Sequence, residues 1–147
     1  MTFGIMKKNT APKSNRKIKD TKPEYFIKKK PGRFLDITIK GDLTKPLFFK
    51  AMHELINHPD YFEKSTIWNL LDAKMRLSFE DLREITYILR KYKLQQKVNE
   101  KKLAVVASGE FNIYIIKFSI ELLSFLPFEF RIFDDYDEAI IFLKNSI

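Results

Sequence analysis

The sequence lacks cysteine altogether and is poor in glycine, and each shortage excludes a class of function. Without Cys the chain can form neither a disulfide nor a thiolate metal site, and it suits a reducing compartment such as the cytoplasm. Only 4 Gly occur in 147 residues, and no Walker loop or Gly-x-Gly-x-x-Gly motif is found. A glycine-rich phosphate cradle is therefore excluded, and we expect no cofactor.

Long apolar runs are also missing. No run reaches the roughly 18 residues that a membrane-spanning helix needs, and the N-terminus has no continuous apolar stretch typical of a secretory signal. We therefore expect no transmembrane segment and a cytoplasmic location.

Motifs of common enzymes are absent as well. There is no Gly-x-Ser-x-Gly sequence around a nucleophile. The two histidines, His53 and His58, are five residues apart, which is about 140° of rotation on a helix, so they do not share a face. We therefore expect neither a hydrolase nor a metalloenzyme.

Positive charge is concentrated at the N-terminus. Of the 27 Lys and Arg residues, 11 lie in residues 1–33, where only Asp20 and Glu24 oppose them, so the net charge of +8 belongs to this segment. Residues 7–23 contain one large apolar side chain, Ile18, which is too little to offset the chain entropy lost on folding. We expect a flexible basic arm at 1–23 and one folded domain at 24–147.

The arm has two interpretations. It is a solubilising extension, or its cations contact nucleic acid phosphates or another anionic surface. It has no aromatic side chain between its cations for base stacking and no framed element for reading base edges. The cations available for such contacts are Lys7, Lys8, Lys13, Arg16, Lys17 and Lys19.

The remainder of the chain alternates strand and helix patterns. Period-two or short apolar runs predict strands, helical spacing of apolar residues predicts helices, and Pro-Gly at 31–32 predicts a hairpin turn. Gly41-Asp42 is expected to end the second strand and Asp72 the third. The order β-β-α-β-α-β-α-β-α predicts a single α/β domain with a mixed, mostly parallel sheet. The expected strands are 25–30, 33–40, 66–71, 102–107 and 130–133, and the expected helices are 44–57, 78–92, 111–126 and 136–144.

This order resembles the STAS domain, and most closely its SpoIIAA-like (STAS/SEC14-like) branch. The resemblance covers about residues 25–147 and implies a non-enzymatic regulatory or protein-interaction module like the anti-anti-sigma factors. Some relatives of this fold hold apolar ligands. The segments that carry the resemblance are the strand at 34–41 with its terminal Gly, the loop at 58–62, and residues 68–72, 103–106, 130–133 and 137–139.

Ser78 has both a structural and a regulatory interpretation. The phosphorylatable members of the family carry an Asp-Ser-Ser-Gly-like motif at the start of the second helix. Here residues 75–81 read MRLSFED, so only Ser78 corresponds, and the preceding Asp and the Gly are missing. Ser78 and Asp81 have the spacing of a capping box. We predict that Ser78 caps the helix rather than acting as a phosphorylation site.

Two other polar groups follow expected strands. Asp72 stands where a strand is expected to end, and with Lys74 and Arg76 it could form a partner surface; alternatively, it binds loop amides. Ser108-Gly109 lies between a strand and a helix, so its N–H groups could contact an anion, or the pair is an ordinary turn.

The third expected helix is apolar over two arcs. One arc includes Phe111, Tyr114 and Phe118, whereas packing on a sheet needs an arc of only about 100–140°. The second arc therefore needs another cover, which is a neighbouring helix, a dimer or partner surface, or an apolar ligand. That second arc consists of Ile113, Ile116, Ile120 and Leu123.

These features favour a regulatory module that binds a protein partner or a second copy of itself. The alternative is a binder or carrier of a small apolar ligand. A weaker alternative is a nucleic-acid-associated accessory protein that acts through the basic arm.

Overall fold

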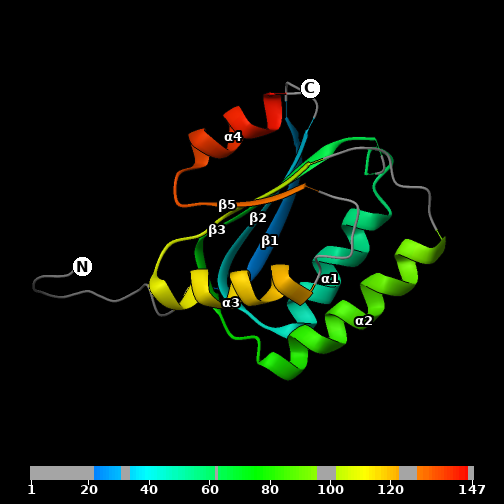
Figure 1. Ribbon diagram of the computed structural model, residues 1–147, viewed down its shortest axis with the longest axis vertical. Coiled ribbons are helices and arrows are strands. Elements are labelled where there is room, and N and C mark those ends of the chain that lie inside the picture. The colour runs from blue at the N-terminus through cyan, green and yellow to red at the C-terminus, as the bar shows by residue number, and fades with distance from the viewer. Residues whose placement is uncertain (1–21, 31–33, 62, 96–101, 123–128, 146–147) are drawn as a thin grey trace, which may run out of the picture.

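The computed structural model describes residues 22–30, 34–61, 63–95, 102–122 and 129–145 (Figure 1). Strands and helices follow one another in the predicted order. Their bounds are β1 (Glu24–Lys30), β2 (Phe34–Leu43), α1 (Lys45–Ile56), β3 (Ser65–Met75), α2 (Phe79–Gln95), β4 (Lys102–Val106), α3 (Glu110–Leu122), β5 (Glu129–Phe133) and α4 (Tyr136–Lys144).

The five strands form one sheet in the order in which they occur along the chain. β1 runs antiparallel to β2, and the pairs β2–β3, β3–β4 and β4–β5 are parallel. The predicted mixed, mostly parallel sheet is therefore confirmed.

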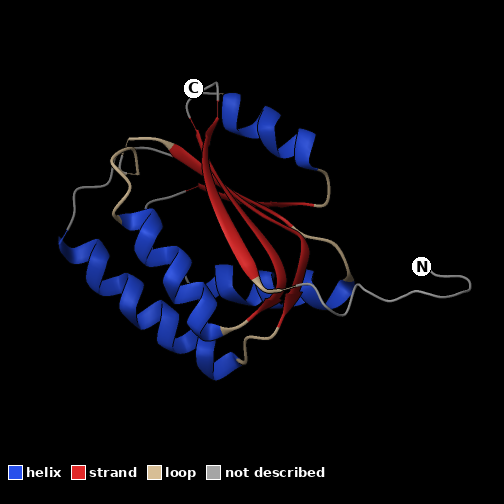
Figure 2. Ribbon diagram, turned by 180° about the vertical axis from the view of Figure 1, so that it is seen from behind, coloured by secondary structure: helices blue, strands red, loops and turns tan. Residues whose placement is uncertain are grey.

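Helices cover the two faces of the sheet unequally. Figures 1 and 2 show α1, α2 and α3 on one side and α4 on the other. The larger hydrophobic core lies under the three helices. It includes Leu35, Ile37 and Ile39 of β2. A smaller core lies under α4 and includes Phe34 and Ile67, because successive strand residues point to opposite faces.

β2 and β3 are longer than predicted, and the expected strand ends at Gly41 and Asp72 are wrong. Gly41 remains inside β2, with φ +83, and a Cβ at this position would lie 3.0 Å from the Cα of Pro23. Glycine therefore serves a close backbone approach here rather than a strand end. Asp72 lies inside β3, paired with Lys40 and exposed.

A β-bulge interrupts the pairing of β2 with β3 just before Asp72. Between the pairs Thr38–Asn69 and Lys40–Asp72, β2 advances two residues and β3 advances three. The extra residue shifts the alternation of β3, so that Ala73 is buried in the same core as Trp68.

Asn112 at the start of α3 replaces the strand partner that β3 lacks beyond Asn69. β4 ends at Val106, which pairs with Asn69. Past that point the Asn112 amide Nδ2 donates to the Ala73 carbonyl at 3.2 Å, and its Oδ1 accepts from the Met75 N–H at 3.2 Å. The side chain thus satisfies exposed strand backbone and attaches α3 to β3.

The predicted helix caps are present. The Thr44 hydroxyl accepts from the Leu47 N–H at 3.4 Å. The Ser78 hydroxyl accepts from the Asp81 N–H at 3.0 Å, and the Asp81 carboxylate accepts from the Ser78 N–H at 2.9 Å. The capping box predicted from the spacing of Ser78 and Asp81 is therefore confirmed.

A buried carboxylate anchors α4 to the sheet. Asp36 on β2 accepts from the Thr38 hydroxyl at 2.6 Å and also from the hydroxyl of Tyr136, the first residue of α4. Burial, followed by the hydrogen bond to Asp36, raises the pKa of Tyr136 above its usual value. The phenol therefore keeps its proton and remains a donor to the carboxylate.

Candidate ligand-binding cavity

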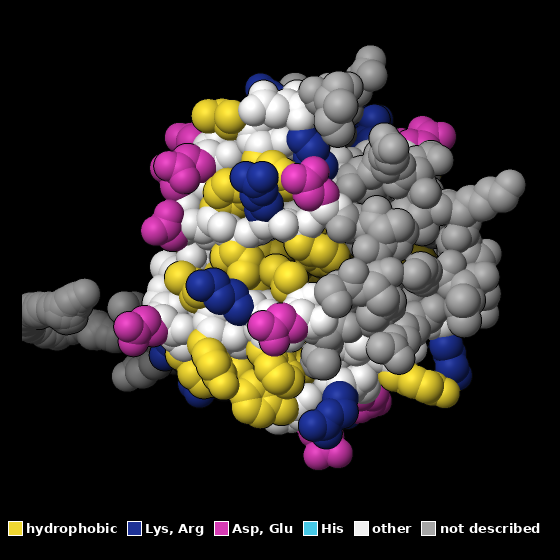
Figure 3. All heavy atoms as spheres, viewed as in Figure 1, with side chains coloured by type: hydrophobic (Ala, Val, Ile, Leu, Met, Phe, Trp, Pro, Cys, Tyr) yellow, Lys and Arg dark blue, Asp and Glu magenta, His cyan; other side chains and the backbone are white. Residues whose placement is uncertain are grey.

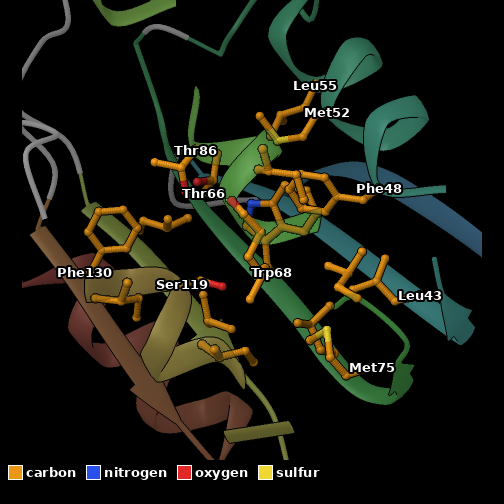
Figure 4. Close-up of a pocket in the computed structure, with 18 of the residues that line it drawn as sticks. Leu43, Phe48, Met52, Leu55, Thr66, Trp68, Met75, Thr86, Ser119 and Phe130 are labelled. Atoms are coloured by element: carbon orange, nitrogen blue, oxygen red, sulfur yellow. Dashed lines mark hydrogen bonds between the residues drawn. The ribbon is translucent and has the colours of Figure 1, made fainter. Parts of the chain in front are cut away.

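A cavity of about 140 Å³ lies within the larger core. Its walls come from the inner face of the sheet and from all three helices on that side, as Figure 4 shows. Trp68 on β3 forms part of the sheet wall, and its ring stacks on Phe48 of α1 with centroids 5.4 Å apart. Met52 lines the cavity from α1, Ile85 from α2, and Ile116 from α3.

The described lining carries no charged side chain. It consists of aliphatic and aromatic residues together with five groups that can form hydrogen bonds: Tyr61, Thr66, Trp68, Thr86 and Ser119. Burial raises the pKa of Tyr61 to about 12, so this phenol is neutral near pH 7. A charged ligand group would lose its hydration without gaining a counter-charge, so the cavity suits an uncharged occupant.

Two of the lining hydroxyls are satisfied within their own helices. The Thr86 hydroxyl donates to the Leu82 carbonyl at 2.8 Å, and the Ser119 hydroxyl donates to the Ile115 carbonyl at 3.2 Å. Neither is paired with a general base, so neither is arranged as a nucleophile.

The second apolar arc of α3 faces inward. Ile116 and Ile120 line the cavity, and Ile113 packs against the same core. The remaining member, Leu123, lies outside the described residues. Of the covers considered for this arc, the structure shows neighbouring helices of the same domain, while a partner surface and an apolar ligand stay predictions.

The other arc of α3 carries exposed apolar side chains that lie beside an exposed ring of α2. Phe111 and Tyr114 are 61% and 58% exposed, and Phe79 at the start of α2 is 40% exposed. The centroid of the Phe79 ring lies 6.1 Å from the centroid of the Tyr114 ring and 4.4 Å from that of the Phe118 ring. Figure 3 shows hydrophobic side chains gathered over α3 and the beginning of α2, with charged groups around them. We call Phe79, Phe111 and Tyr114 the aromatic surface.

The residues expected near the end of the third strand lie away from the cavity. Asp72, Lys74, Arg76 and Ser78 are all exposed, and none of them lines the cavity. The Arg76 Nε lies 3.4 Å from an Asp42 carboxylate oxygen, so this cation pairs with β2. Because Asp72 lies inside β3, the expectation that it stands at the end of a strand is wrong.

Ser108 and Gly109 lie between β4 and α3 as expected, and contact of their N–H groups with an anion stays a prediction. Both are exposed, and Gly109 has φ +84, a conformation that favours glycine. The Gly109 carbonyl accepts from the Ile113 N–H at 3.1 Å at the start of the helix.

The other sequence predictions concern metals, membranes and the arm. In the described ranges, no three His, Asp or Glu side chains gather in a way that could hold a metal ion. None of the helices in the described part of the chain has the length and apolar character needed to cross a membrane. The basic arm, including Lys7, Lys8, Lys13, Arg16, Lys17 and Lys19, lies outside the described residues.

Comparison with known proteins identifies the fold. No family model matches the sequence, and no curated protein matches it. The structure is similar to the crystal structure of an uncharacterized protein from the DUF3478 family, with a SpoIIAA-like fold, from Shewanella loihica PV-4. The TM-score is 0.56 at 18% sequence identity, and the match covers 82% of this chain and 93% of that one.

The chain therefore has a SpoIIAA-like α/β fold, as the resemblance implied. At 18% sequence identity, the similarity between the two structures establishes the fold alone.

Proposed function

We propose that this protein is a non-enzymatic, cytoplasmic binding module that holds a small uncharged apolar molecule in the cavity under α1, α2 and α3. The observation that carries the proposal is the cavity of about 140 Å³, whose described lining carries no charged side chain. Protein interiors are normally packed as densely as organic crystals, with few voids larger than a water molecule. An apolar cavity of about 150 Å³ is large enough to bind benzene.

The chemistry of the lining supports binding rather than catalysis. Neither histidine lines the cavity, and the Thr86 and Ser119 hydroxyls already donate to helix carbonyls. Tyr61, the lining residue with a raised pKa, stays protonated at neutral pH. A site of this kind holds an apolar molecule without a group suited to activate it.

Trp68 provides the test, because it is the chain's only tryptophan and lies in the cavity wall. When the full chain is titrated with toluene, the tryptophan fluorescence should change until the signal saturates. The melting temperature should rise as well. Ser119→Leu should fill the cavity and reduce toluene affinity at least tenfold while the chain stays folded. The matched control, Lys117→Leu, places leucine on the exposed side of the same helix and should bind toluene like the wild type.

Two outcomes would contradict the proposal. One is a linear, non-saturating fluorescence change in the wild type. The other is a folded Ser119→Leu variant that binds toluene as tightly as the Lys117→Leu control.

A second candidate function is regulation through protein contact, and the aromatic surface favours it. Three partly exposed rings on adjacent helices form an apolar patch of a kind that commonly marks an interaction site. We propose that this patch binds a second copy of the chain.

Exchanging Phe111 and Tyr114 together for serine should shift the mass measured by light scattering from dimer to monomer. The melting temperature should stay within about 2 °C, and a wild type that is already monomeric would contradict self-association.

A further inference from the structure

Two hydrogen-bonding groups in the cavity wall have no hydrogen-bond partner among the described residues. Thr66 is 3% exposed and Trp68 is 8% exposed, so both side chains are buried. Within the described part of the chain, nothing forms a hydrogen bond with the Thr66 hydroxyl or the Trp68 indole N–H. Buried polar groups in folded proteins are nearly always paired, because an unpaired one has lost its water without replacing it.

The two groups lie together. Thr66 and Trp68 are two residues apart on β3, so both point to the face of the sheet that forms the cavity. Figure 4 shows the indole nitrogen of Trp68 on the side of its ring where Thr66 and Thr86 lie. The Thr86 proton is already donated to the Leu82 carbonyl. Among the described residues on this side, the Trp68 N–H and the Thr66 O–H are the donors that lack an acceptor.

The surroundings determine which acceptor these donors suit. A carboxylate or phosphate would lie among apolar side chains, and the described lining offers no cation to balance its charge. A neutral oxygen avoids that penalty and can accept from an indole N–H and a hydroxyl together, because a carbonyl oxygen has two lone pairs.

We propose that the occupant is an uncharged molecule with a single carbonyl oxygen as acceptor, such as a small ketone, held by the Trp68 N–H and the Thr66 hydroxyl. This inference rests on the proposed binding function and assigns the chemistry of its ligand. The volume of about 140 Å³ suits a molecule of on the order of six to ten non-hydrogen atoms, since a similar cavity binds benzene. Trp68 and Thr66 are then the residues that distinguish such a molecule from a hydrocarbon of the same shape.

The test compares cyclohexanone with methylenecyclohexane, which has the same shape but carries CH₂ in place of the carbonyl oxygen. Affinities of both probes for the full-length wild type, Thr66→Val and Trp68→Phe are measured by calorimetry. The ratio of ketone to hydrocarbon affinity should fall about fivefold to tenfold in each variant, the range expected for one lost hydrogen bond. Because valine matches threonine in shape, hydrocarbon affinity should stay within about twofold in Thr66→Val.

Thr38→Val is the matched control. Thr38 is also a strand threonine, but its hydroxyl bonds to Asp36 under α4 and it does not line the cavity. This variant should lose stability without changing the affinity ratio, which separates a folding defect from a lost ligand contact.

The possible failures are distinguishable. If both probes bind and the ratio is the same in the wild type, Thr66→Val and Trp68→Phe, ordered water satisfies the two donors and the inference is wrong, while the proposed binding function stands. If neither probe binds the wild type but toluene does, the inference is wrong and the proposed function stands; if toluene fails as well, the proposed function fails together with the inference. Hydrocarbon binding by each variant verifies that its cavity is still formed.

Discussion

Replacing Ile116 with asparagine should lower the free energy of unfolding by about 3–5 kcal/mol, because the change removes a buried aliphatic group and buries an amide. Ile116 is 5% exposed and lies in the cavity wall on α3. Chemical denaturation of the variant and the wild type measures the loss. Ile120→Asn should have a smaller effect of roughly 1–2 kcal/mol, since Ile120 is only partly buried.

Tyr114→Asn is the control for Ile116→Asn. Tyr114 is on the same helix but 58% exposed, so this change should cost less than about 1 kcal/mol. Equal losses at residues 114 and 116 would show that α3 does not present Ile116 to the core. If both variants were as stable as the wild type, the packing of α3 on the sheet would be refuted.

Removing the Tyr136 hydroxyl should cost about 2 kcal/mol, because Tyr136→Phe leaves the buried Asp36 carboxylate with one donor fewer. Tyr25→Phe is a matched control, since Tyr25 donates to Glu54 at 2.6 Å at an exposed site. Its loss should stay under about 1 kcal/mol. A double-mutant cycle with Asp36→Asn isolates the contribution of the pair.

The Tyr136 effect should also depend on pH. The pKa of Tyr136 is raised in the folded state by burial and by the Asp36 hydrogen bond. Its contribution is therefore complete below the unfolded tyrosine pKa of about 10 and decreases as the pH rises above that value, where only the unfolded chain releases the proton. The stability difference between wild type and Tyr136→Phe should shrink above pH 10. A difference that stays constant into that range, or is no larger than that of Tyr25→Phe, would contradict the buried pair.

The order of strands and helices could be predicted because local signals were clear. Thr44 and the Ser78/Asp81 pair satisfy helix N-termini as their spacing indicated. The ends of β2 and β3 could not be predicted, because distant parts of the chain extend them. Pro23 packs on the Gly41 backbone, and Asn112 replaces a missing strand for β3. A local pattern contains no information about such contacts.

The cavity was predictable only in part. The double apolar arc of α3 pointed to a second cover, and Ile116 and Ile120 do line the cavity. Periodicity fixes the angles between residues of one helix but not the rotation of that helix against the sheet. The exposure of Phe111 and Tyr114 therefore became clear only in the fold. In the sequence, Thr66 and Trp68 look like ordinary strand residues. Their role in the cavity could not be predicted, because the cavity depends on how three helices pack against the sheet.

The position of α4 has a consequence for synthesis on the ribosome. Strands that are adjacent in sequence are adjacent in the sheet, so each strand and helix can dock on the preceding unit as it emerges. The face under α4 remains uncovered for longer: Phe34 emerges early, but its cover begins only at Tyr136. At typical elongation rates that interval is on the order of ten seconds. During this time the nascent chain presents an apolar sheet face, to which chaperones or another nascent chain can bind before the last helix closes it.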